Sequence, residues 1–240
     1  MRPLRFVSVL LLLIVLSARA EDAEELARIH TEAIGGRERL DRWRAMRATG
    51  TVLSDGSELE FELIAARPNR VHVRIRSEGR ELVQATDGDH AWQFDGATAK
   101  ALTPADARAF KADAEFDDPL ASLPERGYAL DFAGEVAWQE RTAFKVLVTR
   151  PGEEPSFLLV DPETYFVVAR VTQQTNARGR QVTMETRYDD FRPVAGILLP
   201  FQIQVFADGR LLRETVLRQV LPILEPPPET FAMPATTLGG

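Results

Sequence analysis

Hydrophobic residues near the start of the chain recur with the period of an α-helix. Four of them stand at positions i, i+3, i+4 and i+7 and so share one helix face: Leu26, Ile29, His30 and Ala33. Gly35-Gly36 is expected to end this helix, because glycine accepts the left-handed conformation that is common at helix C-termini. Three further apolar positions predict a second short helix: Leu40, Trp43 and Met46.

From Thr49 the pattern changes to period 2, which is typical of strands. Strand-like runs are expected to resume near Tyr128, after a helix that begins at Thr103-Pro104 and an irregular stretch at 116–124. The other predicted strands are 59–65, 71–76, 81–86, 91–94, 143–149, 156–160, 164–175, 181–190, 197–206 and 211–220.

About eleven consecutive strands, joined by tight turns and interrupted once by helix, favour an antiparallel meander over a parallel α/β fold. No linker or change of composition divides the chain. The sequence therefore predicts an α+β fold and a single domain over residues 21–240.

Residues 1–20 have the features of a secretory signal peptide. Arg2 and Arg5 are followed by an apolar run of about eleven residues, too short to span a bilayer core of roughly 30 Å. Ala18-Arg19-Ala20 provides the small residues that a signal peptidase recognises, so the mature chain is expected to start at Glu21 without a transmembrane segment. An uncleaved anchor is the alternative.

Charge and cysteine content narrow the function further. The net charge is −7, and loss of the arginines in residues 1–20 makes the chain more acidic, which argues against nucleic acid or anionic lipid headgroups as the main partner. The absence of cysteine excludes disulfides, iron–sulfur clusters and thiol catalysis, and it leaves the signal peptide without a lipid-modified cysteine.

Polar residues offer little sign of catalysis. Three histidines, His30, His72 and His90, have no metal-ligand spacing; His30 is expected in or beside the core, and His72 in solvent on the polar side of a strand. No nucleophile motif, phosphate-binding loop or dinucleotide fingerprint is present. We therefore expect no enzyme, no catalytic residue, no metal and no cofactor.

Large apolar side chains recur on nearly every predicted strand. Either the helices fill the concave side of the sheet completely, or a cavity that suits an acyl chain remains. The candidate lining residues of such a trough are Phe61, Leu63, Val71, Val73, Ile75, Trp92, Phe94, Phe157, Leu159, Ile203 and Val205. Three residues of the helical insertion are candidate lid residues: Phe110, Phe116 and Leu120.

Several motifs together resemble the LolA-like, outer-membrane lipoprotein-sorting proteins of the periplasm, in the family's generic branch. The motifs, in order, are 30–36 with Leu40, 49–51, 67–71, 85–88 with Trp92, 161–165, 188–191, 196–201 and 231–234. The resemblance implies a half-open antiparallel β-barrel of about eleven strands, with helices across its mouth as a lid. It also implies an apolar concave face that holds lipid or lipoprotein acyl chains. Arg44 and Arg47 are both candidates for the family's lid-locking arginine.

The expected function is that of a periplasmic carrier or chaperone, which shields lipid or lipoprotein acyl chains on the way to the outer membrane. Its expected partners are a lipid or an acylated protein, with an envelope protein as a further partner. A periplasmic sensor or adaptor that uses the barrel as a scaffold is the alternative. A cell-envelope assembly subunit without a small ligand is a third hypothesis.

Overall fold

The computed structural model describes residues 22–77, 79–113, 119–122, 127–149, 154–175 and 179–234. The predicted signal peptide and Phe116 lie outside these residues. After a helix at 22–33, the elements are α2 (Arg37–Arg42), β1 (Ala45–Ser54), β2 (Ser57–Ala66), β3 (Arg70–Ser77), β4 (Arg80–Thr86), β5 (Ala91–Phe94), β6 (Ala99–Ala101), α3 (Pro104–Asp113), α4 (Pro119–Ser122), β7 (Ala129–Trp138), β8 (Arg141–Thr149), β9 (Ser156–Val160), β10 (Val167–Thr175), β11 (Gln181–Val194), β12 (Ile197–Ala207), β13 (Arg210–Pro222) and the 3-10 helix η2 (Pro228–Thr230).

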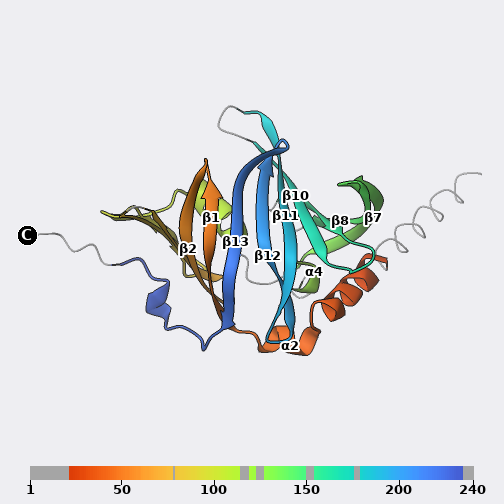
Figure 1. The fold of residues 1–240 in the computed structure, drawn as a ribbon, viewed down its shortest axis with the longest axis horizontal. Helices are drawn as coiled ribbons and strands as arrows, with labels where there is room; N and C mark the ends of the chain where they lie inside the picture. Colours follow the sequence, from red (N-terminus) through yellow and green to blue (C-terminus); the bar gives the residue numbers. More distant parts are fainter. Residues whose placement is uncertain are drawn as a thin grey trace, which may run out of the picture. The chain divides into compact units, whose positions relative to one another are not determined.

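The strands form one open sheet. Its order is β6-β5-β4-β3-β2-β1-β13-β12-β11-β10-β9-β8-β7, and Figure 1 shows β1, β13 and β12 as neighbours in it. β6 and β7 are the two ends of this order, so the sheet of the described residues is not closed. The α+β class is confirmed, but the sheet has 13 strands rather than about eleven. The short β6 was missed because three residues are too few to show a period.

The described residues divide into two compact units. Unit one lies within Met1–Arg37, Pro119–Tyr188 and Val205–Leu211, and unit two within Glu38–Asp118, Asp189–Gln204 and Leu212–Gly240. Their boundaries fall inside β11, β12 and β13, each of which contributes residues to both units. Each unit has its own hydrophobic clusters: Leu26, Leu120 and Leu158 belong to one in unit one, and Trp43, Ala48 and Phe201 to one in unit two.

The predicted helix ends agree with the structure. The helix at 22–33 is followed by Gly35 and Gly36, both with positive φ, and the Gly36 amide donates to the Thr31 carbonyl at 2.9 Å. At α3, the Thr103 hydroxyl accepts from the Asp106 amide and donates to its carboxylate, which satisfies a helix N-terminus. The second predicted helix is shorter than expected, because Met46 belongs to β1.

A β-bulge interrupts the pairing of β1 with β13. The register shifts between Thr49 and Gly50, and the Gly50 carbonyl accepts from Arg218 Nη2 at 3.2 Å. A Cβ added at Gly50 would lie 2.1 Å from the Val216 carbonyl oxygen. Only glycine fits there without a shift of backbone, which gives a structural role to the Thr49-Gly50-Thr51 motif.

Candidate functional site

One face of β2 and β3 in unit two is apolar, and Leu82 of β4 continues it, whereas Gln84 and Thr86 of β4 lie on the same face opposite Val73 and Val71. Residues directly opposite each other in an antiparallel pair share a face, and Phe61 pairs with Ile75, which pairs with Leu82. In the same way Leu63 pairs with Val73, and Ala65 with Val71. We call this surface the Leu63 face. It unites five candidate trough residues: Phe61, Leu63, Val71, Val73 and Ile75.

Exposure on the Leu63 face increases along the strands. Val71 is only 2% exposed, whereas Phe61, Val73 and Ile75 are partly exposed and Leu82 is 38% exposed. The buried end is covered in part by Leu40 of α2 and by Trp43, which pack in one cluster with Leu63. The helices of unit two therefore leave apolar side chains of this face in partial contact with solvent.

The opposite face of the same strands is charged. Arg47 pairs with Glu62 at 2.6 Å, Glu62 with Arg74 at 3.5 Å, and Arg74 with Glu81 at 3.1 Å. Arg76 extends the chain of ion pairs to Glu81 at 3.3 Å. Four strands thus carry alternating charges on this side, as the solvated face of a sheet does. We call this side the Trp92 face.

Trp92 and Phe94 do not lie on the Leu63 face. Ala85 pairs with Trp92 and also with His72, so Trp92 shares the face of Ala85 and His72. Trp92 donates from Nε1 to the carbonyl of Phe231 at 2.8 Å. The expectation that all the candidate residues line one surface is therefore wrong for these two, because Trp92 instead anchors the C-terminal segment.

That segment is held firmly on the Trp92 face. Phe231 is fully buried in a cluster with Ala45 and Ala66. Arg70 lies 5.4 Å from the centre of the Phe231 ring and forms an ion pair with Glu225 at 2.5 Å. Residues 223–231 thus cover apolar side chains at one end of this face.

In unit one, the helix at 22–33 packs against one of the two alternating sets of side chains on β9. Leu158 and Val160 pack in one cluster with Leu26 and Leu120. We call this surface the Leu158 face. Phe157 and Leu159 point to the opposite side, where the ammonium of Lys145 lies 3.8 Å from the centre of the Phe157 ring. They are therefore also separated from the side that the helix covers.

The same side as Leu159 carries a polar cluster that sequence reasoning missed. Trp138 Nε1 donates to Glu185 at 2.7 Å, and Arg187 forms an ion pair with Glu185 at 2.9 Å. Burial alone would raise the pKa of Glu185, but these two donors hold it below its usual value. The Arg187 guanidinium also lies 4.0 Å from the centre of the Phe206 ring.

Two further candidates lie on β12. Ile203 follows the alternation of Ile197, Leu199 and Phe201, which belong to the cluster of Leu63 and Trp43, so it falls on the Leu63 face. Val205 continues that alternation in the part of β12 that belongs to unit one.

The described lid candidates occupy different units. Leu120 is 1% exposed and belongs to the hydrophobic cluster of unit one. Phe110 is partly buried on α3, which contacts β5 in unit two. Neither lies in the cluster that Leu63 forms with Leu40 of α2 and with Trp43, two residues that the sequence had placed only in a short helix.

Neither lid-locking candidate contacts a helix through its side chain in the hydrogen bonds of the described residues. Arg44 is exposed, and Arg47 binds Glu62 on the Trp92 face. Arg67 instead reaches α2: Nη2 donates to the Leu40 carbonyl at 2.8 Å and Nη1 to the Asp41 carbonyl at 3.4 Å. The sequence presented Arg67 only as part of the 67–71 motif, and nothing in that motif pointed to α2.

The histidines are structural or exposed. His30 is buried, as expected, with Nδ1 2.7 Å from the Tyr165 carbonyl. His72 is half-buried rather than solvated, edge-on to Trp92 at 6.3 Å, and burial together with the charge of Arg74 lowers its pKa. His90 is exposed beside Asp87. Within the described ranges, no group of three or more acidic or histidine side chains is placed to hold a metal ion.

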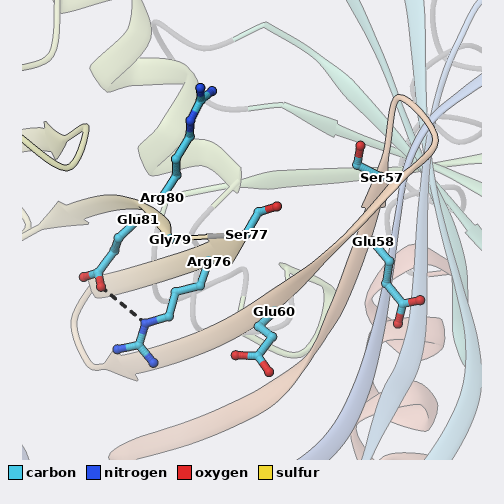
Figure 2. A pocket seen from close by; sticks show the side chains of 8 residues that line it. All are labelled: Ser57, Glu58, Glu60, Arg76, Ser77, Gly79, Arg80 and Glu81. Atoms are coloured by element: carbon cyan, nitrogen blue, oxygen red, sulfur yellow. Dashed lines mark hydrogen bonds and ion pairs between the residues drawn. The ribbon is translucent and has the colours of Figure 1, made fainter.

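An open polar depression lies beside the β1–β2 and β3–β4 turns. It is lined by Ser57, Glu58, Glu60, Arg76, Ser77, Gly79, Arg80 and Glu81. Figure 2 shows these side chains and the ion pair between Arg76 and Glu81. Since every lining side chain is polar or absent, this depression does not suit an acyl chain, and the Leu63 face remains the candidate site.

The similarity to solved structures extends over most of the chain. A DUF1329 family protein from Desulfovibrio piger matches with a TM-score of 0.61 at 10% identity, over 89% of this chain and 97% of that chain. A domain named for outer membrane lipoprotein sorting, from Vibrio parahaemolyticus, matches with a TM-score of 0.58 at 9% identity, over 84% and 92%. A LolA superfamily protein from Nitrosomonas europaea matches with a TM-score of 0.54 at 12% identity, over 84% and 96%.

The sequence itself matches no family model and no curated protein. None of the helices in the described ranges has the length and apolar character needed to cross a membrane. The likeness to these structures covers most of both chains in each comparison, and it agrees with the motifs found in the sequence. The chain therefore has a LolA-like fold.

Proposed function

We propose that this protein is a non-catalytic periplasmic carrier that binds an acyl chain of a lipid or lipoprotein on the Leu63 face. The supporting observation is the contrast between the two sides of β2–β4. One side has Phe61, Val73, Ile75 and Leu82 in partial contact with solvent, and the other has a continuous chain of ion pairs. Contiguous exposed apolar surface on a protein commonly marks a binding site.

The physical benefit of such a face is large. Transfer of one methylene group out of water contributes roughly 0.8 kcal/mol, so a long acyl chain does not leave a membrane for water at a useful rate. An apolar face that accepts the chain offsets this cost without covalent chemistry. We further propose that residues 21–240 act as one domain, in which the open sheet serves as a half-barrel and helices serve as its lid, as in the family that the sequence resembles.

A matched pair of leucines tests the proposal. Leu82 on the Leu63 face is 38% exposed, and Leu53 on the Trp92 face is 39% exposed. Leu82→Glu and Leu53→Glu therefore add the same charge at the same exposure on opposite sides of the sheet. Binding of dansyl-labelled undecanoic acid, followed by its fluorescence, is compared in both variants with the parent protein.

We expect Leu82→Glu to weaken binding by about tenfold or more, because a carboxylate against the chain must lose water without a partner. Leu53→Glu is expected to bind like the parent. Leu63→Glu is a second variant, to be compared only if circular dichroism shows it folded. Equal binding by all folded variants, or loss confined to Leu53→Glu, would refute the carrier proposal. Absence of fatty acid binding together with co-purification of a stoichiometric protein partner would favour the sensor or adaptor.

A further inference from the structure

An arginine lies on the helix-covered side of the sheet in unit one. Arg170 on β10 is directly opposite Leu158 on β9 and Thr186 on β11, so its side chain belongs to the Leu158 face. Leu158 is 1% exposed and lies in the main hydrophobic cluster of the unit. The cationic side chain of Arg170 therefore leaves the backbone beside the apolar core.

One nitrogen of the Arg170 guanidinium, Nε, is buried and has no hydrogen-bond partner among the described residues. Two other arginines with a buried, unbonded Nε are satisfied through a carboxylate or other atoms: Arg74 pairs with Glu81, and Arg67 donates from both Nη atoms to carbonyls of α2. Buried polar groups are normally paired, so an unsatisfied one needs an explanation.

The strand neighbours of Arg170 on this face carry hydroxyl and apolar groups. Thr186 is opposite Arg170, and Thr172 follows two residues along β10 on the same face, opposite Ser156 and Met184. The nearby carboxylate, Glu185, is opposite Val171 and therefore on the other side of the sheet, where Arg187 and Trp138 bind it. No described acidic residue paired with this part of β10 is placed to neutralise Arg170.

We propose that Arg170, with the hydroxyls of Thr172 and Thr186, binds the anionic head group, a carboxylate or a phosphate, of a single-chain amphipathic ligand. A guanidinium presents several N–H donors in a fixed fork that matches both groups. Met184, which is opposite Thr172 and partly exposed, supplies an apolar contact beside it. This inference rests on the proposed function only in that the ligand has an acyl chain, and all the residues of the proposed head-group site belong to unit one.

The acidic composition of the chain does not oppose such a site. Net charge acts at long range, and it disfavours approach to an extended anionic surface. A single head group that is in contact with a partly buried guanidinium is instead governed by close hydrogen bonds in a medium of lower dielectric constant. The site therefore selects one bound molecule and gives no attraction to a membrane surface.

The experiment measures preference for charge. Binding of dansyl-labelled undecanoic acid is compared with binding of its uncharged methyl ester, in the parent protein and in Arg170→Gln. We expect the parent to prefer the acid by about tenfold or more, as hydrogen bonds to charged groups commonly contribute. Arg170→Gln is expected to lose this preference while binding the ester as the parent does, and Arg170→Lys to retain part of it.

Arg210→Gln is the control, because it removes the same charge from an exposed position of unit one. Competition by decanoic acid and by decyl phosphate then shows whether carboxylate or phosphate is the better head group. If the parent binds acid and ester equally, or if Arg170→Gln keeps the preference, the inference is wrong and the carrier proposal stands. If the parent binds neither, both are wrong.

Discussion

Gly50 provides the sharpest test of the fold, because its replacement creates a clash with backbone alone. A Cβ at this position would lie 2.1 Å from the Val216 carbonyl oxygen and 2.9 Å from the Leu217 Cα. Ordinary contacts between such atoms are about 3.5 Å, so β1 and β13 must separate by about 1.4 Å at the bulge. No side-chain rotation relieves this contact, since both opposing atoms belong to the main chain.

The cost of Gly50→Ala follows from two effects. Overpacking commonly destabilises by about 1–3 kcal/mol, and each backbone hydrogen bond that is weakened beside the bulge adds about 1 kcal/mol. We expect a loss of about 3 kcal/mol or more in the free energy of unfolding. For a chain of this length, that loss corresponds to a decrease of roughly 6–12 °C in Tm.

Thermal unfolding followed by circular dichroism measures this change. Gly209→Ala is the control: its φ of +80° imposes strain, but no atom lies within 4 Å of the added Cβ. We expect the control to lose only about 1–2 kcal/mol, the cost of the left-handed conformation. Gly50→Ser should behave like Gly50→Ala, since the first carbon sets the cost. A Gly50→Ala protein within 1 kcal/mol of the parent would refute the close approach at the bulge.

Two further predictions concern unit two. Burial and the charge of Arg74 lower the pKa of His72 below its ordinary 6.5. As the pH falls below 6.5, His72 therefore binds a proton in the unfolded chain before it does so in the folded protein, and the free energy of unfolding should fall. His72→Phe should remove this part of the pH dependence in urea unfolding, and an unchanged difference between pH 7 and pH 5 would contradict it. Arg67→Ala should destabilise by about 1–3 kcal/mol and speed hydrogen exchange in α2, because it frees the carbonyl of Leu40. The exposed Arg42→Ala should change little, and equal effects of the two would refute the role of Arg67.

The sequence by itself determined which segments are strands wherever polar and apolar residues alternate. In β2 and β3, glutamates and arginines alternate with Phe61, Leu63 and Val73, and this fixes the two faces within each strand. Turn and capping residues such as Gly35, Gly36 and Thr103 likewise gave the helix ends. These features are local, because a side chain's direction in a strand depends only on its position along the backbone.

Only the tertiary structure decided which faces belong together. β4 has no clean alternation, and its hydrogen-bonded register with β5 puts Trp92 beside His72 instead of Leu63. On β9 every residue from Phe157 to Val160 is apolar, so the pattern contains no information about sides. The packing of the helix at 22–33 on Leu158 selects one side and leaves Leu159 on the other. Register and helix docking join residues far apart in sequence, so their outcome depends on contacts that no local period records.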